Sequence, residues 1–260
     1  MTHDAFVLSD VGCVREHNED DALVLRDHDV YVVADGMGGH ASGEIASRLS
    51  VEAVDIIYND ARRCEQLEQV YRRLKRSKDL EDVSSFQEYR LRRAVEYGNL
   101  KIFRHSSTDE ALGDMGTTLV AMAFSGSRVY VAFVGDSRAY RCRDGKTEQL
   151  TRDHSLANEL IDMNALRPED LPSFQYKNVI VRALGLQEEV QVESFYRSAK
   201  EGDRFVLCSD GLSDLITGEE IGSVLSSVEG AEAAAEELVA LALAAGGVDN
   251  VTVLVVDVHE

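Results

Sequence analysis

Cysteine is scarce and scattered in this 260-residue sequence, which holds only Cys13, Cys64, Cys142 and Cys208. No two of them stand at C-x-x-C spacing, which argues against both a zinc site and a disulfide framework. Long apolar runs are also missing, since none reaches the roughly 18 residues that a membrane span needs. The N-terminal residues MTHDAFVLSDVG lack the basic and apolar regions of a signal peptide. We therefore expect a cytoplasmic protein with reduced thiols and no membrane span.

Basic residues are few, because 27 Lys and Arg stand against 47 Asp and Glu and the net charge is −20. This excess disfavours a general nucleic-acid-binding surface. The basic residues are unevenly spread, with 12 of the 27 between Arg62 and Arg104 and a dense run, RRLKRSK, at 72–78. A solvated helix exterior is the commoner explanation of such a run. A docking face for an acidic partner in the basic region 62–104 is the alternative.

The order of apolar patterns predicts one domain over residues 1–260. Short strand-like runs come first, and helical spacing follows from residue 42 into an extended helical region at about 60–108. Strands then return, and both prolines fall in a polar, irregular segment at about 152–178. One more strand, two helices and a last strand complete the chain. Strands grouped in this way favour a largely antiparallel α+β fold over a doubly wound parallel sheet.

Aspartates stand at the ends of several apolar runs. Asp35 ends VVAD before glycine, Asp136 ends AFVGD, Asp210 ends VLCSD before glycine, and Asp249 precedes the last strand. A single Asp-Gly pair is usually only a turn. Four such positions beside strands that share a sheet system could instead converge at one end of the sheets.

Converging carboxylates repel one another and are costly to desolvate unless a cation lies among them. Oxygen ligands without a cysteine or histidine cluster select Mg²⁺ or Mn²⁺ over Zn²⁺. The run REHNED adds Glu19 and Asp20 to the acidic groups, and Arg15 offers a planar fork suited to a phosphate. The sequence therefore indicates phosphoester hydrolysis by a metal-activated water.

Taken in order, the motifs resemble the metal-dependent protein phosphatase 2C family in its bacterial Ser/Thr phosphatase form. The resemblance rests on RxxNED at 15–20, ADGMGGHxxGExAS at 34–47, MGTT at 115–118, GDSRAY at 135–140, CSDGLSD at 208–214 and DNVTVLVVDV at 249–258. It implies a central antiparallel β-sandwich flanked by helices on both faces, in four layers ordered αββα. It also implies a centre of two Mn²⁺ or Mg²⁺ ions at one end of the sandwich.

The resemblance also implies a role for each site residue. Asp35 would bridge the two metals, with Asp210 and Asp249 on the first, Glu19 and the carbonyl oxygen of Gly36 on the second, Asp136 with Asp210 on a possible third, and Asp20 in support through water. Arg15 would hold the phosphate oxygens. His40 would protonate the leaving oxygen, although a structural histidine is nearly as good an interpretation. A metal-bridging water would attack phosphorus without a phosphoenzyme.

The substrates implied are proteins phosphorylated on serine or threonine, in bacterial signal transduction. They would include a cognate Ser/Thr kinase or the substrates of that kinase, whose action the enzyme would reverse. The segment at 152–178 corresponds to the family's flap beside the active site. Its centre, LRPEDLPSFQYK, departs from the family pattern, so the resemblance does not define a substrate preference.

Other functions fit the sequence less well. Asp27-x-Asp29 has the spacing of the haloacid-dehalogenase nucleophile, but a strand resumes at once after it, which favours a hairpin turn. Cys208 is not followed by the loop of a cysteine phosphatase, and no Walker P-loop is present. A catalytically dead phosphoprotein-binding scaffold would be expected to lack the metal carboxylates, which this sequence retains.

Overall fold

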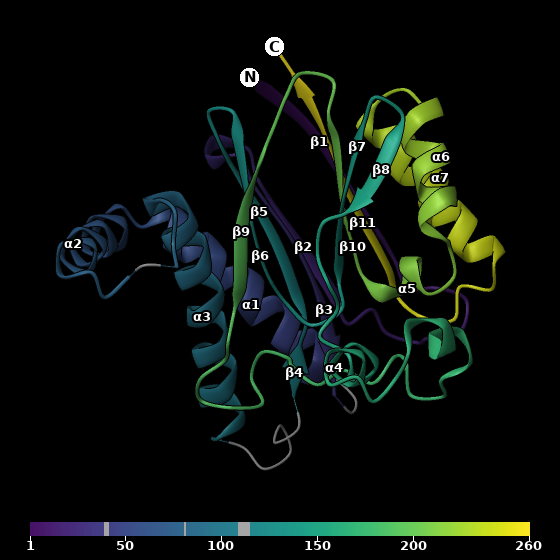
Figure 1. Cartoon of the computed structure of the whole chain (residues 1–260), viewed down its shortest axis with the longest axis horizontal. Coiled ribbons are helices and arrows are strands. Elements are labelled where there is room, and N and C mark those ends of the chain that lie inside the picture. The colour runs from purple at the N-terminus through teal and green to yellow at the C-terminus, as the bar shows by residue number, and fades with distance from the viewer. Residues whose placement is uncertain (39–41, 81, 109–114) are drawn as a thin grey trace.

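The structure, a computed structural model, describes residues 1–38, 42–80, 82–108 and 115–260. Two sheets, antiparallel throughout, form its centre (Figure 1). The first sheet has the order β1 (Thr2–Asp10), β11 (Val251–His259), β10 (Arg204–Cys208), β7 (Arg138–Arg143) and β8 (Lys146–Gln149). The second has the order β2 (Asp20–Leu25), β3 (Val30–Met37), β5 (Leu119–Ser125), β6 (Arg128–Val134) and β9 (Glu193–Ser198), and the short β4 (Gly116–Thr117) pairs with β3.

Helices cover the outer face of each sheet (Figure 1). The second sheet is covered by α1 (Ser42–Asn59) and α3 (Phe86–Ser106), with α2 (Ala61–Ser77) outside them. The first sheet is covered by α5 (Asp210–Ser213), α6 (Gly218–Ser227) and α7 (Ala231–Ala244). The remaining helical turns are η1 (Arg26–His28), α4 (Leu156–Asp162) and η3 (Pro168–Ser173). The predicted α+β sandwich with helices on both faces is confirmed.

Buried apolar residues of the described chain form three clusters: one under the helices of each sheet and one between the two sheets. An inner strand contributes to two of these clusters, because both of its faces are buried. Along β3, Val30 and Val32 pack under α1 and α3, whereas Tyr31 and Val33 pack between the sheets. Alternate side chains of β11 likewise pack against α6 and α7 or into the space between the sheets. Strands buried on both faces read as continuous apolar runs, which explains stretches such as VYVVAD and VTVLVV.

Local signals in the sequence form the structures that they predict. Asp144 and Gly145 connect β7 to β8 as a two-residue hairpin turn, and both have positive φ. Thr217 and Glu220, which have the spacing of a capping box, form one at the start of α6. Asp27 lies in η1 between the paired strands β2 and β3, so the haloacid-dehalogenase interpretation is wrong. In the part of the chain that is described, no helix combines the length and apolar character needed to cross a bilayer.

Candidate functional site

The predicted carboxylates come from both sheets and meet at one end of the sandwich. In the second sheet, Asp20 and Asp35 are direct cross-strand partners on β2 and β3, and Asp136 follows the end of β6. From the first sheet, Asp210 begins α5 directly after β10, and Asp249 stands just before β11. Strand ends from two packed sheets thus place acidic groups from distant parts of the sequence in one region.

The pKa values of these carboxyl groups show how strongly they interact. Desolvation raises the pKa of Asp35 well above its ordinary value, and the charges of Asp20, Asp210 and Asp136 raise it further. Desolvation is also the main cause for the others: the pKa rises to about 7 for Asp20, about 7 for Asp136 and about 6 for Asp210. Asp35 and Asp210 lie close enough for the Asp35 carboxyl to donate a hydrogen bond to Asp210. These carboxyl groups keep their protons to higher pH because burial outweighs the nearby positive charge, which at Asp210 comes from Arg15.

The donor set fits a hard cation. Among the described residues, Asp20 and Asp136 each keep one buried carboxylate oxygen, Oδ1, without a hydrogen-bond donor. Buried acceptors of this kind are uncommon and call for a partner. No three His, Cys, Asp or Glu side chains of the described ranges are yet arranged around one point, so holding an ion requires the carboxylates to draw together. Oxygen ligands of this type suit Mg²⁺ or Mn²⁺.

Glycines allow the chain to pack tightly around Glu19. A Cβ atom on Gly36 would lie 2.2 Å from the carbonyl oxygen of Gly43 and 2.5 Å from that of Glu19. A Cβ on Gly43 would lie 2.7 Å from Cδ of the Glu19 side chain. Both contacts are closer than real Cβ atoms show. Backbone atoms block a Cβ on Gly36, so this position requires glycine, whereas a Cβ on Gly43 would require the end of the Glu19 side chain to move. The first turn of α1 can therefore lie directly against the Glu19 carboxylate, whose pKa burial raises.

Arg15 lies at the exposed rim of the site. Its Nη2 donates to Oδ2 of Asp249 at 2.7 Å, and half of the Arg15 side chain is accessible to solvent. The hydrogen bond to Asp249 and the charge of that carboxylate raise the pKa of Arg15. The guanidinium therefore points at one of the predicted metal ligands and remains accessible to a phosphate. His40 falls outside the described residues.

Asn250 is a site residue that the sequence analysis missed. Its Oδ1 accepts the backbone N–H of Glu19 at 2.9 Å, and its Nδ2 donates to the carbonyls of Val11 and His17, both at 2.9 Å. One buried amide thus ties the loop that carries Arg15 and Glu19 to the start of β11. In the sequence, Asn250 is the second residue of the motif DNVTVLVVDV, but its amide contacts are not evident there.

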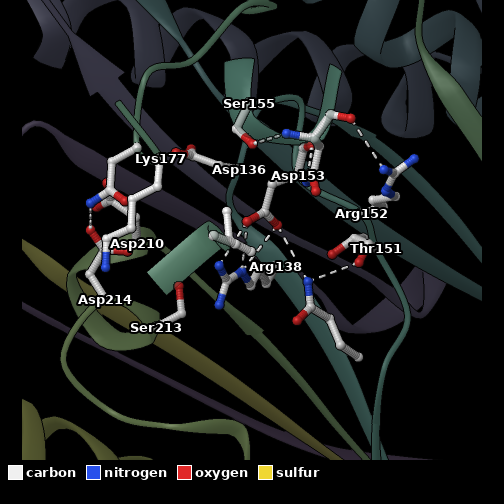
Figure 2. A pocket seen from close by; sticks show the side chains of 14 residues that line it. Asp136, Arg138, Thr151, Arg152, Asp153, Ser155, Lys177, Asp210, Ser213 and Asp214 are labelled. Atoms are coloured by element: carbon white, nitrogen blue, oxygen red, sulfur yellow. Dashed lines mark hydrogen bonds and ion pairs between the residues drawn. The ribbon is translucent and has the colours of Figure 1, made fainter. Parts of the chain in front are cut away.

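A pocket of about 490 Å³ adjoins the carboxylates (Figure 2). Figure 2 shows Asp210 and Asp214 on one side of it and Arg138 with Asp153 on the other. Arg138 forms a bidentate ion pair with Asp153, at 3.0 Å from Nε to Oδ1 and 2.7 Å from Nη2 to Oδ2. Arg138 is therefore held in a structural ion pair.

Residues of the segment at 152–178 line the same pocket, with Arg152 near its start and Lys177 and Asn178 near its end. Nδ2 of Asn178 donates to Oδ2 of Asp214 at 2.5 Å, which links the end of this segment to the residue directly after α5. The segment therefore borders the pocket that contains Asp136 and Asp210.

His154 supports this segment from inside. It is buried, stacks on Phe133 with ring centroids 5.0 Å apart, and accepts the backbone N–H of Gly135 through Nδ1 at 3.0 Å. Its Nε2 lies 3.0 Å from Oε1 of Glu193. Since Gly135 precedes Asp136, His154 holds the turn that carries this carboxylate. His154 is therefore a structural residue beside the site and is not exposed to solvent.

Comparisons with known proteins agree on one family. The model of the family described as Protein phosphatase 2C matches residues 14–245. The serine/threonine phosphatase stp of Listeria welshimeri is 33% identical over 252 residues, which cover 96% of this chain and 93% of that protein.

Two solved structures extend the likeness to the whole fold. The Mycobacterium tuberculosis serine/threonine phosphatase PstP/Ppp matches with a TM-score of 0.86 and 35% identity, covering 100% of both chains. The catalytic domain of PstP in complex with two manganese ions matches with a TM-score of 0.81 and 36% identity, covering 99% of both chains.

Proposed function

The chain belongs to the protein phosphatase 2C family, and from this membership we propose that it is a protein serine/threonine phosphatase that hydrolyses phosphoserine and phosphothreonine with the help of bound metal ions. The observation that carries the proposal is the group of carboxylates with raised pKa values and two buried oxygens that lack donors. Such a group is stabilised by a divalent cation, and a related structure contains two manganese ions.

The ligand roles that we propose are those that the family resemblance implies. We assign Asp35 to both ions, Asp210 and Asp249 to the first, Glu19 and the carbonyl of Gly36 to the second, and Asp136 with Asp210 to a third. Asp20, which accepts a hydrogen bond from the Ser209 hydroxyl at 2.7 Å, supports this set from behind. Bound Mn²⁺ or Mg²⁺ supplies Lewis acidity and activates water for attack on phosphorus.

The chain's own residues bind and orient the substrate. Arg15 exchanges its contact with Asp249 for two oxygens of the substrate phosphate, which its fork fits. Asn250 keeps the loop of Arg15 and Glu19 in place during this exchange. We assign protonation of the leaving serine or threonine oxygen to His40. We propose, as the family resemblance implies, that water attacks phosphorus in line and that no phosphoenzyme forms.

The biological role proposed is reversal of a bacterial Ser/Thr kinase in the cytoplasm. Its substrates would be the cognate kinase or the proteins that the kinase phosphorylates. The segment at 152–178 acts as the flap beside the substrate, and the helical region at 60–108 as an added recognition element. The flap assignment comes from the family resemblance and agrees with the residues of this segment that line the pocket. The recognition role is proposed from the basic composition of the helical region.

Hydrolysis of p-nitrophenyl phosphate tests the proposal directly. After chelation, activity should be absent, and Mn²⁺ or Mg²⁺ should restore it. The variants Asp35→Asn and Asp210→Asn should lose roughly 10²- to 10³-fold in kcat, whereas Asp27→Asn, in the β2–β3 hairpin, should keep full activity. Inactivity with every metal would refute the proposed phosphatase activity and favour a phosphoprotein-binding scaffold. Full activity of both site variants would refute the metal-binding roles assigned to Asp35 and Asp210.

A further inference from the structure

Helix α2 is the least buried long helix of the molecule. None of its residues is buried, and it stands away from the sandwich, beyond α3 (Figure 1). Its apolar side chains face the body of the protein: the Tyr71 ring lies 5.6 Å from that of Phe86 and 5.5 Å from that of Tyr89. The opposite face of α2 is therefore free of the fold, and its composition is not explained by packing.

That outward face is basic. At 100° per residue, the apolar positions 64, 67, 71 and 74 share one side of the helix, and Arg72, Arg73 and Arg76 lie on the other. Arg72 pairs with Glu68 at 2.7 Å, whereas Arg73 and Arg76 have no carboxylate within ion-pair distance among the described residues. These arginines, with Gln69 and Ser77, line a shallow hollow of about 500 Å³.

Helix stability alone accounts for only part of this pattern. Cations are favoured in the last turn of a helix because they interact with the helix dipole, which suits Lys75 and Arg76. This effect falls off within one turn, so it does not require Arg72 and Arg73. Three arginines around one hollow form instead the arrangement with which proteins bind carboxylates and phosphates.

The charge of the remaining chain favours an acidic segment of a phosphoprotein as the partner of α2. Helix α2 contains six basic and two acidic residues, whereas the rest of the chain contains 21 basic and 45 acidic residues. A phosphoprotein gains about −1.5 to −2 charges with each phosphate, so most of this surface repels it. The outward face of α2 is where an acidic segment of such a protein is attracted.

Resting on the proposed phosphatase function, we propose that Arg72, Arg73 and Arg76 of α2 form a docking site for an acidic segment of the protein substrate, away from the phosphate that is hydrolysed. A membrane surface fits less well, because the apolar face of α2 is turned to α3 and cannot enter lipid. A second copy of the chain fits less well, because two bodies of charge −20 repel each other.

Two phosphoserine peptides with the same cleavage site test the docking. One carries a glutamate-rich tail on a flexible linker, and the other a neutral tail of the same length. At low salt, the wild-type protein should favour the acidic tail by roughly tenfold in kcat/KM, through KM, and lose this preference at high salt. The triple variant Arg72→Gln, Arg73→Gln, Arg76→Gln should show no preference and should keep its helical circular dichroism.

A matched control removes the same charge elsewhere. Lys146→Gln, Arg197→Gln and Lys200→Gln change three exposed basic residues at and beside β8 and β9, and this variant should keep the preference. Both triple variants should hydrolyse p-nitrophenyl phosphate as fast as the wild type. Three outcomes would each overturn the docking site. The wild-type protein could show equal kcat/KM values for the two peptides, the α2 variant could keep the preference for the acidic tail, or the control variant could lose it.

Direct binding separates the docking site from the chemistry. Fluorescence anisotropy of the labelled acidic tail, without any phosphoserine, should report binding that the α2 variant lacks, even if no metal restores hydrolysis. Absence of hydrolysis with intact tail binding would therefore refute the proposed function and leave the docking site. If the tail does not bind, two further results would replace the docking site. Arg72-dependent binding of anionic vesicles would indicate a membrane contact, and salt-sensitive self-association in sedimentation would indicate a dimer contact.

Discussion

The carboxylate end of the sandwich and the outward face of α2 are two highly charged regions of opposite sign and opposite environment. At the carboxylate end, anions lie close together, partly or fully buried, and burial raises the pKa of Asp35, Asp20, Asp136 and Asp210. On α2, arginines are spread over an exposed helix with no buried residue. Charged groups therefore affect one another's pKa values strongly at the buried carboxylate end and are exposed to solvent on α2.

The difference shows that burial decides the strength of an electrostatic interaction. Water and salt screen the arginines of α2, so each ion pair there contributes little to stability or binding. The aspartates are removed from water and must keep a proton or gain a cation. We therefore expect changes near the carboxylates to affect folding and metal binding strongly, and changes on α2 to affect only the choice of substrate.

The largest effect should come from Gly36→Ala. The added Cβ would meet the backbone oxygens of Gly43 and Glu19, neither of which can move independently. We expect a loss of about 4 kcal/mol in the free energy of unfolding and of one Mn²⁺ per chain in titration calorimetry. Gly218→Ala is the control, since no atom lies within 4 Å of its Cβ position. A Gly36→Ala protein as stable as the wild type would show that the carboxylate end tolerates repacking.

The next effect concerns pH in the metal-free protein. The pKa values of Asp20, Asp136 and Asp210 are raised to about 7, 7 and 6, so the folded state holds more protons than the unfolded state between pH 4 and 7. Each unit by which a pKa is raised corresponds to about 1.4 kcal/mol, so stability should fall by several kcal/mol as pH rises through this window.

Urea unfolding in chelator at both ends of this pH window measures the change. Saturating Mn²⁺ should remove most of the fall, because the cation replaces the protons. His154, whose pKa burial lowers, acts in the opposite sense and makes the fall smaller. Stability that rises with pH in the metal-free protein would contradict the raised pKa values of the carboxylates.

A smaller effect should follow from Asn250→Ala. The substitution leaves the N–H of Glu19 and the carbonyls of Val11 and His17 without their partner, and we expect a loss of about 2 kcal/mol. The KM for aryl phosphate and the affinity for Mn²⁺ should weaken together, because the loop carries both Arg15 and Glu19. Asn59→Ala, at an exposed amide, serves as the control. Loss of stability with unchanged KM and metal affinity would limit Asn250 to folding.

The smallest effect should come from the outward face of α2. Replacing Arg72, Arg73 and Arg76 by glutamine should change the free energy of unfolding by less than about 0.5 kcal/mol. Arg90→Gln, in the neighbouring α3, should cost about 2 kcal/mol, since Arg90 stacks on Tyr58 and donates to the carbonyls of Ile57 and Tyr58. Equal effects of the two changes in urea unfolding would remove the contrast between exposed and buried charge.

Much of the fold could be predicted from local patterns. The hairpin at Asp144 and Gly145 and the capping box of Thr217 and Glu220 depend on residues close in sequence, and both are present. The grouping of strands gave the antiparallel α+β class. The position of aspartates at strand ends predicted which carboxylates would meet, because strand ends of packed sheets share an edge. The metal roles of these residues stay predictions.

The contacts that position the site could not be predicted. Asn250 and the Glu19 backbone are 231 positions apart, and Arg15 and Asp249 are 234 apart. Neither pair follows from periodicity, which reports only the face of a helix or strand to which a side chain belongs. The ion pair of Arg138 with Asp153 joins β7 to the loop between β8 and α4, and no local pattern predicts this partner.

The sequence by itself determined the alternation of buried faces, the turns and the aspartates at the strand ends, because these depend on neighbouring residues and their hydrophobicity. The tertiary structure alone decided which oxygen of Asp20 and Asp136 lacks a donor, which loop Asn250 holds, and that α2 presents its arginines to solvent. Those outcomes depend on how distant segments pack against one another. Hydrogen-bond partners and burial are properties of that packing and not of any single segment.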